Sequence, residues 1–351
     1  MISSLKLNNF RNYNEKNFSF GQKTIICGKN GIGKTNLLEA INLCSTTKSF
    51  RSNPDSSLVC WGSDYYRLES EINLSSEIST LEIIYQKTSP NSKKITKVNK
   101  NKVSLANFVG LLKVVIYSFE SNEIILGSPG TRRKFLDMLL CQVDQTYTHN
   151  LIKFYRVLKN RNELLYKIRE RLADPDELDF WDAELCNLSS EIYDKRSELV
   201  NFLNKNINDF YNQISNIDGV IKITLDSHSI LDIDQLHRFR EKEIKKAITL
   251  YGPHRDDVLF LINGDNVADH LSRGEIKSVL FALKKSEAEF VFDKCLELPL
   301  ILIDDIFAEL DASRREKLVN FIEKNQVIIT STEEDDLKKL FKKSDLVLLN
   351  G

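Results

Sequence analysis

A glycine-rich stretch near the N-terminus limits the possible folds of this chain more than any other feature. Gly28–Thr35 reads GKNGIGKT and contains three of the 13 glycines among the 351 residues. The apolar run Lys23–Cys27 before it is typical of a short buried strand, and Thr35–Cys44 after it has the apolar spacing of a helix. Glycines between a strand and a helix let backbone N–H groups converge on phosphate oxygens. The stretch therefore predicts a phosphate-binding loop.

The polar residues of this loop predict that the phosphate belongs to a nucleoside triphosphate. The loop matches the pattern G-x-x-x-x-G-K-[ST], in which the lysine contacts the β- and γ-phosphates and the hydroxyl residue binds Mg²⁺. These roles fall to Lys34 and Thr35. The residues of the loop that we expect at the nucleotide are Asn30, Gly31, Ile32, Gly33, Lys34, Thr35 and Asn36.

The acidic residue that such a magnesium site requires stands far away in the sequence. Leu300–Ile303 form an apolar strand that runs into Asp304 and Asp305. We expect Asp304 to hold the metal and Asp305 to polarise the attacking water as a general base or positioning group. The alternative is a structural acidic turn. From Thr35 to Asp304 is 269 positions, so the middle of the chain must leave one sheet and return to it.

The pattern of apolar residues divides the chain into three segments. Residues 1–125 read mostly as strands, residues 126–218 as long helices, and residues 219–351 as alternating strands and helices. We expect an α/β P-loop ATPase head with mixed sheets, formed by the first and third segments and interrupted by an α-helical lobe. The middle segment keeps the apolar spacing of a coiled coil over too few heptads for a long coiled coil. It therefore predicts an antiparallel helical hairpin.

Composition places the chain among folded globular proteins, with 42% hydrophobic and 28% charged residues. No apolar run approaches the ~20 residues of a membrane span, and the N-terminus lacks the layout of a signal peptide. We therefore expect a cytoplasmic protein without a membrane partner. The six cysteines are scattered, which argues against a disulfide framework or a zinc site. The net charge of −1 neither supports nor excludes a local surface for nucleic acid.

A third motif, LSRGE at Leu271–Glu275, opens an amphipathic helix. Ser272 and Gly274 offer a hydroxyl group and backbone N–H groups to an anion at the helix N-terminus. An ordinary capping box, with Ser272 as the cap and Glu275 three residues later, explains the same residues.

These three motifs, in this order and spacing, resemble the heads of ABC-type ATPases. A helical insertion between the first and last motifs is the layout of the SMC/Rad50 branch, and Asp311 stands where such heads carry the D-loop. More closely, the chain is similar to the RecF family of bacterial DNA replication and repair proteins. The segments that carry this similarity are Leu5–Tyr13, Gly28–Ile41, Lys48–Ser52, Gly127–Asp137, Tyr251–Asp257, Leu271–Glu287 and Leu300–Asp311.

The resemblance implies ATP and Mg²⁺ as cofactors and a homodimer that closes on ATP. Ser272 and Gly274 would then meet the γ-phosphate bound to the other subunit, and Arg11 would contact a nucleotide phosphate. A salt bridge is the structural alternative for Arg11. The resemblance further implies binding to gapped DNA at single-strand/double-strand junctions, and help in loading the RecA recombinase together with RecR and RecO.

The chain departs from ABC heads where these usually have a catalytic glutamine and a histidine. Glu120 and Thr330 stand in the corresponding regions and are the candidates for those roles. Asp305 replaces the usual glutamate, and its shorter side chain suggests a weak ATPase that works as a switch.

Several basic residues admit a functional and a structural interpretation. His254 and Arg255 of YGPHRDD either contact phosphate, DNA or a partner, or belong to a turn stapled by ion pairs. Arg132 and Arg133 open a helix and predict either a bound anion or a paired carboxylate. The five lysines of Lys93–Lys102 suit a DNA backbone contact or a solvated hairpin.

Two other functions compete with DNA repair. An ATPase subunit of an ABC transporter is disfavoured by the long helical insertion between the motifs. An SMC-like structural tether between DNA sites is disfavoured because the predicted helical arm is short.

Overall fold

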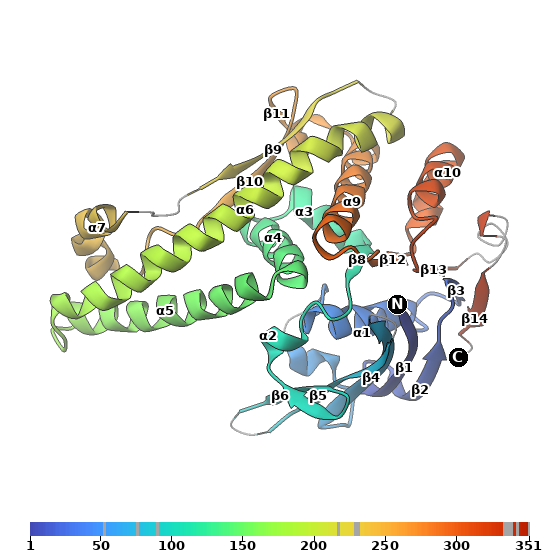
Figure 1. Cartoon of the computed structure of the whole chain (residues 1–351), viewed down its shortest axis with the longest axis horizontal. Coiled ribbons are helices and arrows are strands. Elements are labelled where there is room, and N and C mark those ends of the chain that lie inside the picture. The colour runs from blue at the N-terminus through green and yellow to red at the C-terminus, as the bar shows by residue number, and fades with distance from the viewer. Residues whose placement is uncertain are drawn as a thin grey trace. The chain divides into compact units, whose positions relative to one another are not determined.

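The polypeptide enters a largely helical unit twice and returns each time to a unit built on two sheets (Figure 1). In this computed structural model, the described residues are 1–351 without 52–53, 75–76, 89–90, 216–217, 228–231, 333–339, 342–343 and 350–351, and for residues 74, 308 and 309 only the backbone is described. Unit 1 comprises Met1–Asn122, Asp209–Asp218 and Arg273–Gly351, and unit 2 comprises Glu123–Asn208 and Gly219–Ser272.

A parallel sheet of unit 1 joins segments from both ends of the chain. Its order is β14-β3-β13-β12-β8, and every neighbouring pair is parallel. Parallel strands are buried on both faces, which explains why these sequences read as apolar runs. The sheet confirms that the strand before the glycine-rich loop (β3) and the acidic strand (β12) share one sheet. The bounds are β3 Lys23–Cys27, β8 Val114–Tyr117, β12 Leu300–Asp304, β13 Val327–Ser331 and β14 Asp345–Leu348.

Alternate residues of the parallel sheet point into two hydrophobic cores. On one face, Ile26 and Leu302 pack with helix α1 (Lys34–Thr46) and with the second sheet of the unit. On the other face, Ile25 and Ile303 pack with helices that include α9 (Arg273–Cys295) and α10 (Ala312–Phe321). The sheet is therefore the middle layer of unit 1, which is the architecture expected for an ATPase head.

The second sheet of unit 1 is antiparallel and has the order β2-β1-β4-β5-β6-β7. Strand β5 shows the alternating burial of a sheet with one solvent face. The bounds are β1 Ile2–Phe10, β2 Tyr13–Ser19, β4 Tyr65–Leu74, β5 Glu77–Gln86, β6 Lys93–Val98 and β7 Asn101–Val103. Short helical turns complete the unit: η1 Asp55–Leu58, α2 Leu105–Phe108, η2 Phe119–Asn122 and η4 Ile306–Glu309.

Unit 2 is built around two long helices, α5 (Gln145–Arg169) and α6 (Leu178–Ile214). The expected helical hairpin is present, and Figure 1 shows α5 beneath α6 along its length. Asp174 and Glu177 form a capping box at the turn between them, with Pro175 at the first helical position. The other elements are α3 Glu123–Leu126, α4 Pro129–Val143, η3 Pro175–Glu177, β9 Ile221–Asp226, α7 Ile233–Lys246, β10 Asp257–Ile262, β11 Asp265–Asn266 and α8 Val267–His270.

The division of the chain differs from the expected segments: residues 209–218 belong to unit 1 rather than to the helical lobe, residues 123–125 belong to unit 2, and the largest difference follows residue 218. We expected residues 219–351 to belong to the head, but residues 219–272 group with the helical unit. The physical reason is that β9 is bound to the side of α6. The amide of Asn208 pairs with both the N–H and the C=O of Ile221, at 2.7 and 2.9 Å. One helical turn away, Asn204 pairs in the same way with Ile223, at 2.8 and 2.7 Å.

Candidate functional site

The glycine-rich loop has a backbone conformation that its glycines make possible. Gly31 and Gly33 have φ angles of 79° and 118°, in the region that side chains disfavour. A Cβ atom at Gly33 would also lie 2.7 Å from Asn12 Nδ2 and 2.8 Å from Tyr13 Oη. These two side chains donate hydrogen bonds to the carbonyl groups of Ile32 and Gly33, at 2.8 and 3.1 Å. The turn between β1 and β2 therefore fixes the loop from outside.

Lys34 begins helix α1 and is only 4% exposed. Its Nζ donates to the carbonyl groups of Gly28, at 2.8 Å, and Lys29, at 3.4 Å, and lies 3.6 Å from Asp305 Oδ2. The ammonium group is thus folded against the loop, where a phosphate group would meet it.

Thr35 and Asp304 come together although 269 residues separate them. Thr35 Oγ1 donates to Asp304 Oδ1 at 2.9 Å, and Thr330 Oγ1 donates to the same oxygen at 2.8 Å. Burial raises the pKa of Asp304, and the hydroxyl groups of Thr330 and Thr35 oppose this shift. A carboxylate and hydroxyl groups are the hard oxygen donors that Mg²⁺ prefers, so the residues present fit this ion.

The residues beside Asp304 are also fixed. The N–H group of Asp305 donates to Thr330 Oγ1 at 3.0 Å, and Asp305 has a φ angle of 54°. The strained backbone turns the Asp305 carboxylate to the side of Lys34. Thr330, a candidate for a role at the phosphate, therefore contacts both members of the acidic pair. Asp311 caps helix α10 by accepting a hydrogen bond from the N–H group of Arg314 at 2.9 Å.

The structure shows the salt bridge that was the alternative for Arg11. Its Nε and Nη2 donate to the two carboxylate oxygens of Glu39, each at 2.8 Å, and its Nη1 donates to the carbonyl group of Ser57. Glu39 is fully buried and lies 3.9 Å from Arg51, which also lies 3.5 Å from Glu120. Sequence reasoning missed Glu39 and Arg51. The signal was a glutamate within the apolar face of the helix Thr35–Cys44.

An open groove of about 390 Å³ lies beside the loop in unit 1. Asn12 and Asn36, which line it, are hydrogen-bonded to each other at 2.8 Å. At its other side stands Trp61, which is 98% exposed. The groove is lined by Arg11, Asn12, Asn36, Arg51, Ser57, Val59, Cys60 and Trp61. A planar aromatic surface near a phosphate-binding loop suits a nucleobase.

Ser272 and Gly274 lie at the start of helix α9, as the sequence predicts. Ser272 directly precedes the helix and is exposed. Gly274 lies in the first turn, and apart from its chain neighbours and the backbone of its own helix, no described atom lies within 4 Å of the position that a Cβ would take there. At Gly274 there is therefore space for another molecule.

The YGPHRDD motif forms a turn in unit 2 that is held by ion pairs. Asp256 pairs with the buried Arg196 at 2.9 Å, and Asp257 pairs with Arg132 at 2.7 Å. Arg133 donates to the carbonyl group of Asp256 at 2.6 Å. For Arg132, the paired carboxylate is therefore the alternative that the structure shows.

His254 and Arg255 both contact the carbonyl group of Thr249, with His254 Nε2 at 3.2 Å and Arg255 Nη2 at 3.3 Å. Both residues are thus parts of the YGPHRDD turn that the ion pairs hold in place. In the basic stretch Lys93–Lys102, Lys94 pairs with Asp55 at 2.7 Å and Lys97 with Glu82 at 3.1 Å.

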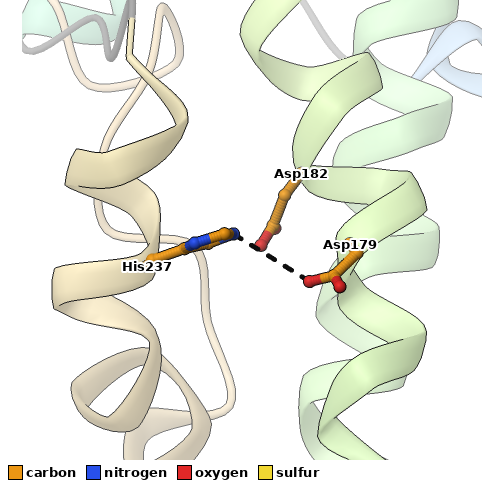
Figure 2. A group of neighbouring side chains, drawn as sticks. All are labelled: Asp179, Asp182 and His237. Atoms are coloured by element: carbon orange, nitrogen blue, oxygen red, sulfur yellow. Dashed lines mark ion pairs between the residues drawn. The ribbon is translucent and has the colours of Figure 1, made fainter.

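A second group of polar residues in unit 2 has side chains of types that bind metals. Figure 2 shows His237 of α7 pointing toward Asp179 and Asp182 of α6. However, Arg240 donates to both carboxylates at 2.6 Å, and Arg161 occupies the other oxygen of Asp182 at 2.7 Å. Arginines already occupy both carboxylates, so this group is an ion-pair network between helices.

Among the described residues, none of the helices has both the length and the apolar character needed to cross a membrane.

Comparison with known proteins agrees with this geometry. Residues 1–348 match the profile of the RecF/RecN/SMC N terminal domain. The DNA replication and repair protein RecF of Agathobacter rectalis is 36% identical over 97% of this chain and 94% of its own. The protein of the same name from Bacillus subtilis is 31% identical over 96% of this chain and 94% of its own.

Solved structures show the same similarity. A structure of the recombination mediator protein RecF-ATP in the RecFOR pathway has 31% identity and a TM-score of 0.89, over 95% of this chain and 92% of that one. An Smc head domain from Pyrococcus furiosus, 16% identical with a TM-score of 0.55 over 97% of this chain and 91% of that one, shares the fold. The profile match and the near full-length identity to these relatives show that the chain belongs to the RecF family of DNA replication and repair proteins.

Proposed function

We propose that this protein is an ATP-dependent DNA-binding factor of replication and repair. In the proposed cycle, two copies close on ATP, hold DNA at single-strand/double-strand junctions or gaps, and help load the RecA recombinase with RecR and RecO. Weak hydrolysis of ATP then releases the dimer. The observation that supports this proposal most is the 2.9 Å contact between Thr35 Oγ1 and Asp304 Oδ1. It brings the loop and the acidic strand together, as a site for phosphate and magnesium requires.

The residues around this contact divide the work at the phosphates. Lys34 exchanges its carbonyl partners and Asp305 for the β- and γ-phosphates. Thr35 and Asp304 hold Mg²⁺, which neutralises charge on the phosphate oxygens when bound. The N–H groups of the loop from Asn30 to Thr35 bind phosphate oxygens. Asp305, released from Lys34, orients the attacking water or accepts its proton.

The groove beside the loop takes the base and ribose of ATP. Trp61 offers a nearly fully exposed ring for stacking, and Asn12 and Asn36 offer amide groups. The ion pair of Arg11 with the buried Glu39 holds the wall of this groove in place. Arg11 thus supports the nucleotide site indirectly, by fixing the position of the groove wall.

The start of α9 contacts the nucleotide that is bound to the second copy of the protein. In the dimer, the Ser272 hydroxyl group and the N–H groups near Gly274 bind the γ-phosphate that the other subunit holds. Negative charge is favoured at a helix N-terminus, and a γ-phosphate that completes the partner's site links dimerisation to ATP.

The test is the oligomeric state, measured by light scattering with ATP and gapped DNA. The unmodified protein is expected to be a dimer with both present. Lys34→Ala is expected to lose ATP binding, and Ser272→Arg is expected to bind ATP and remain a monomer. Ser104→Arg, another exposed serine that precedes a helix, is the matched control and is expected to dimerise. Dimers of Lys34→Ala and Ser272→Arg that form without nucleotide would reject the proposal.

A further inference from the structure

One face of helix α5 is exposed and carries aromatic and basic residues that the ATP site does not use. The opposite face is buried through residues such as Phe154, Val157 and Leu165. On the exposed face, Tyr155 and Tyr166 keep 46% and 51% of their surface accessible. Both rings lie on the same helix and line one surface groove.

The two tyrosines belong to a repeated doublet. Tyr155 is followed by Arg156, and Tyr166 is followed by Lys167. The repeat of 11 residues equals about three helical turns, so both doublets lie on one face and about 16 Å apart. Each doublet combines an exposed ring with an adjacent positive charge, and the guanidinium of Arg169 also lies over the Tyr166 ring, 5.0 Å from its centroid.

The charge of this helix differs from that of the whole chain. Between residues 145 and 172, the exposed cations are Lys153, Arg156, Lys159, Lys167, Arg169 and Arg171, and the exposed carboxylates are Glu163 and Glu170. Six positive against two negative charges give a local excess of four, whereas the chain carries a net charge of −1. The helix therefore attracts an anionic ligand.

Ion pairs leave much of this excess charge available. Lys153 is paired with Glu184 of α6, and Lys159 has only a solvent-exposed contact of 3.7 Å with Glu163. Arg156, Lys167 and Arg171 form no ion pair with any described residue. Two of these three cations are the basic members of the doublets.

A shallow groove of about 720 Å³ runs between the two rings. The side chains between the rings include Leu158, Lys159 and Asn162, and Leu172 lies beyond Tyr166. The groove lies entirely along residues 155–172, so it is open along the helix.

We propose that this face of α5 binds a single strand of nucleic acid, with bases stacked on Tyr155 and Tyr166 and phosphates at Arg156 and Lys167. Proteins that bind single strands combine exposed aromatic rings with a positively charged track in this way. The distance between the rings suits a strand of roughly four nucleotides, the lower end of known site sizes. The proposal rests on the DNA binding proposed above and assigns its single-stranded part to this face.

The separation of the two ring–cation doublets favours a nucleic acid over an apolar partner helix. A partner helix would need a continuous apolar stripe, but the middle of this face carries Lys159, Asn162 and Glu163. A strand of nucleic acid needs only the separate rings and the cations beside them.

The test uses the full chain and a fluorescent oligo(dT), with and without ATP, and fluorescence anisotropy as the readout. Tyr155→Ala and Tyr166→Ala are each expected to weaken binding roughly five- to a hundredfold, the range for one stacked base. Tyr155→Phe and Tyr166→Phe keep the rings and are expected to bind as the unmodified protein does. Circular dichroism checks that the helix content of every variant is unchanged.

The basic residues have a separate signature. The double variant Arg156→Ala/Lys167→Ala is expected to lower the slope of log K against log salt by about 1.4, because each lost phosphate contact of a single strand removes about 0.7. Lys153→Ala, which removes a cation already paired with Glu184, is the matched control and is expected to leave the slope unchanged. Photocrosslinking with an oligo that contains 5-iodouracil is expected to label Tyr155 or Tyr166.

The outcomes separate this inference from the proposed function. Unchanged oligo(dT) binding by both alanine variants would overturn the inference and leave ATP-dependent dimerisation untouched. The protein could also bind oligo(dT) through the two tyrosines and yet fail to dimerise with ATP. This result would support the inference and contradict the proposed function.

Discussion

At the scale of single residues, His254 shows how packing decides between two interpretations of a motif. The sequence suggested a contact with phosphate, DNA or a partner, or a turn. In the structure Nε2 faces the carbonyl group of Thr249, and Nδ1 is buried without a partner among the described atoms. Burial, together with the nearby Arg255 and Arg133, lowers the pKa of His254 to about 4. The neutral imidazole is therefore part of the folded state.

This shift predicts how stability depends on pH. The pKa of His254 is about 4 in the folded chain and about 6.5 in the unfolded chain, so between these values the unfolded chain binds more protons. Stability is then full above pH 6.5 and falls as the pH drops toward 4, by up to about 3 kcal/mol. The measurement is urea unfolding at several pH values between 4 and 7.

His254→Gln keeps a polar side chain of similar size and does not titrate, so its stability is expected to change less over the same pH range. Equal slopes for the variant and the unmodified protein would contradict the assignment.

At the scale of elements, a buried arginine joins three helices of unit 2. Arg161 of α5 is fully buried and donates to Asp182 of α6 at 2.7 Å and to Glu243 of α7 at 2.6 Å. Its remaining Nη donates to Thr249 Oγ1 at 2.8 Å. Buried charges of this kind need every partner, since removal of one leaves the others uncompensated.

Arg161→Ala is therefore expected to lower the free energy of unfolding of unit 2 by about 3–5 kcal/mol. The measurement is urea denaturation followed by the fluorescence of Trp181, in a Trp61→Phe background, because the chain has only two tryptophans. Arg156→Ala, on the exposed face of the same helix, is the control and is expected to change stability by about 0.5 kcal/mol or less. A similar small change for Arg161→Ala would show that the network is dispensable.

Most elements could be predicted from the sequence where their pattern is local. The glycine-rich loop, the acidic strand and the helical hairpin each have a short signature, and the structure contains all three. The grouping of residues 219–272 could not be predicted, because it depends on Asn204 and Asn208, which bond to a strand as another strand would. Likewise, Glu39 looks like an ordinary helix residue until Arg11 is brought to it by the sheet.

At the scale of the whole molecule, the chain builds unit 1 from segments that are distant in sequence. In the parallel sheet, β3 and β8 come from the N-terminal part, and β12, β13 and β14 come from the C-terminal part. The two parts interlock, since the N-terminal strand β3 lies between the C-terminal strands β14 and β13. The sheet and its two cores hold the parts together without need of a continuous backbone.

This interlocking predicts that the chain survives a cut. A protease site placed at Leu172–Asp174, in the turn between α5 and α6, is expected to give two fragments that elute together after cleavage. The fragments are expected to separate in urea, which dissolves the sheet, and the uncut protein with the same insertion is the control. Fragments that separate in native buffer would show that the two parts of the sheet do not hold each other.

The same sheet has a consequence for how the protein is made. The hydrogen-bonded residues Thr35 and Asp304 lie 269 residues apart, so at roughly 5–20 residues per second the ribosome delivers the second about 13–54 s after the first. During this interval β3 has emerged without the neighbours that later cover both its edges. A nascent strand with unpaired edges is prone to pair with the wrong strand. The newly synthesised N-terminal part therefore needs protection from such pairing, for instance by a chaperone, until translation nears its end.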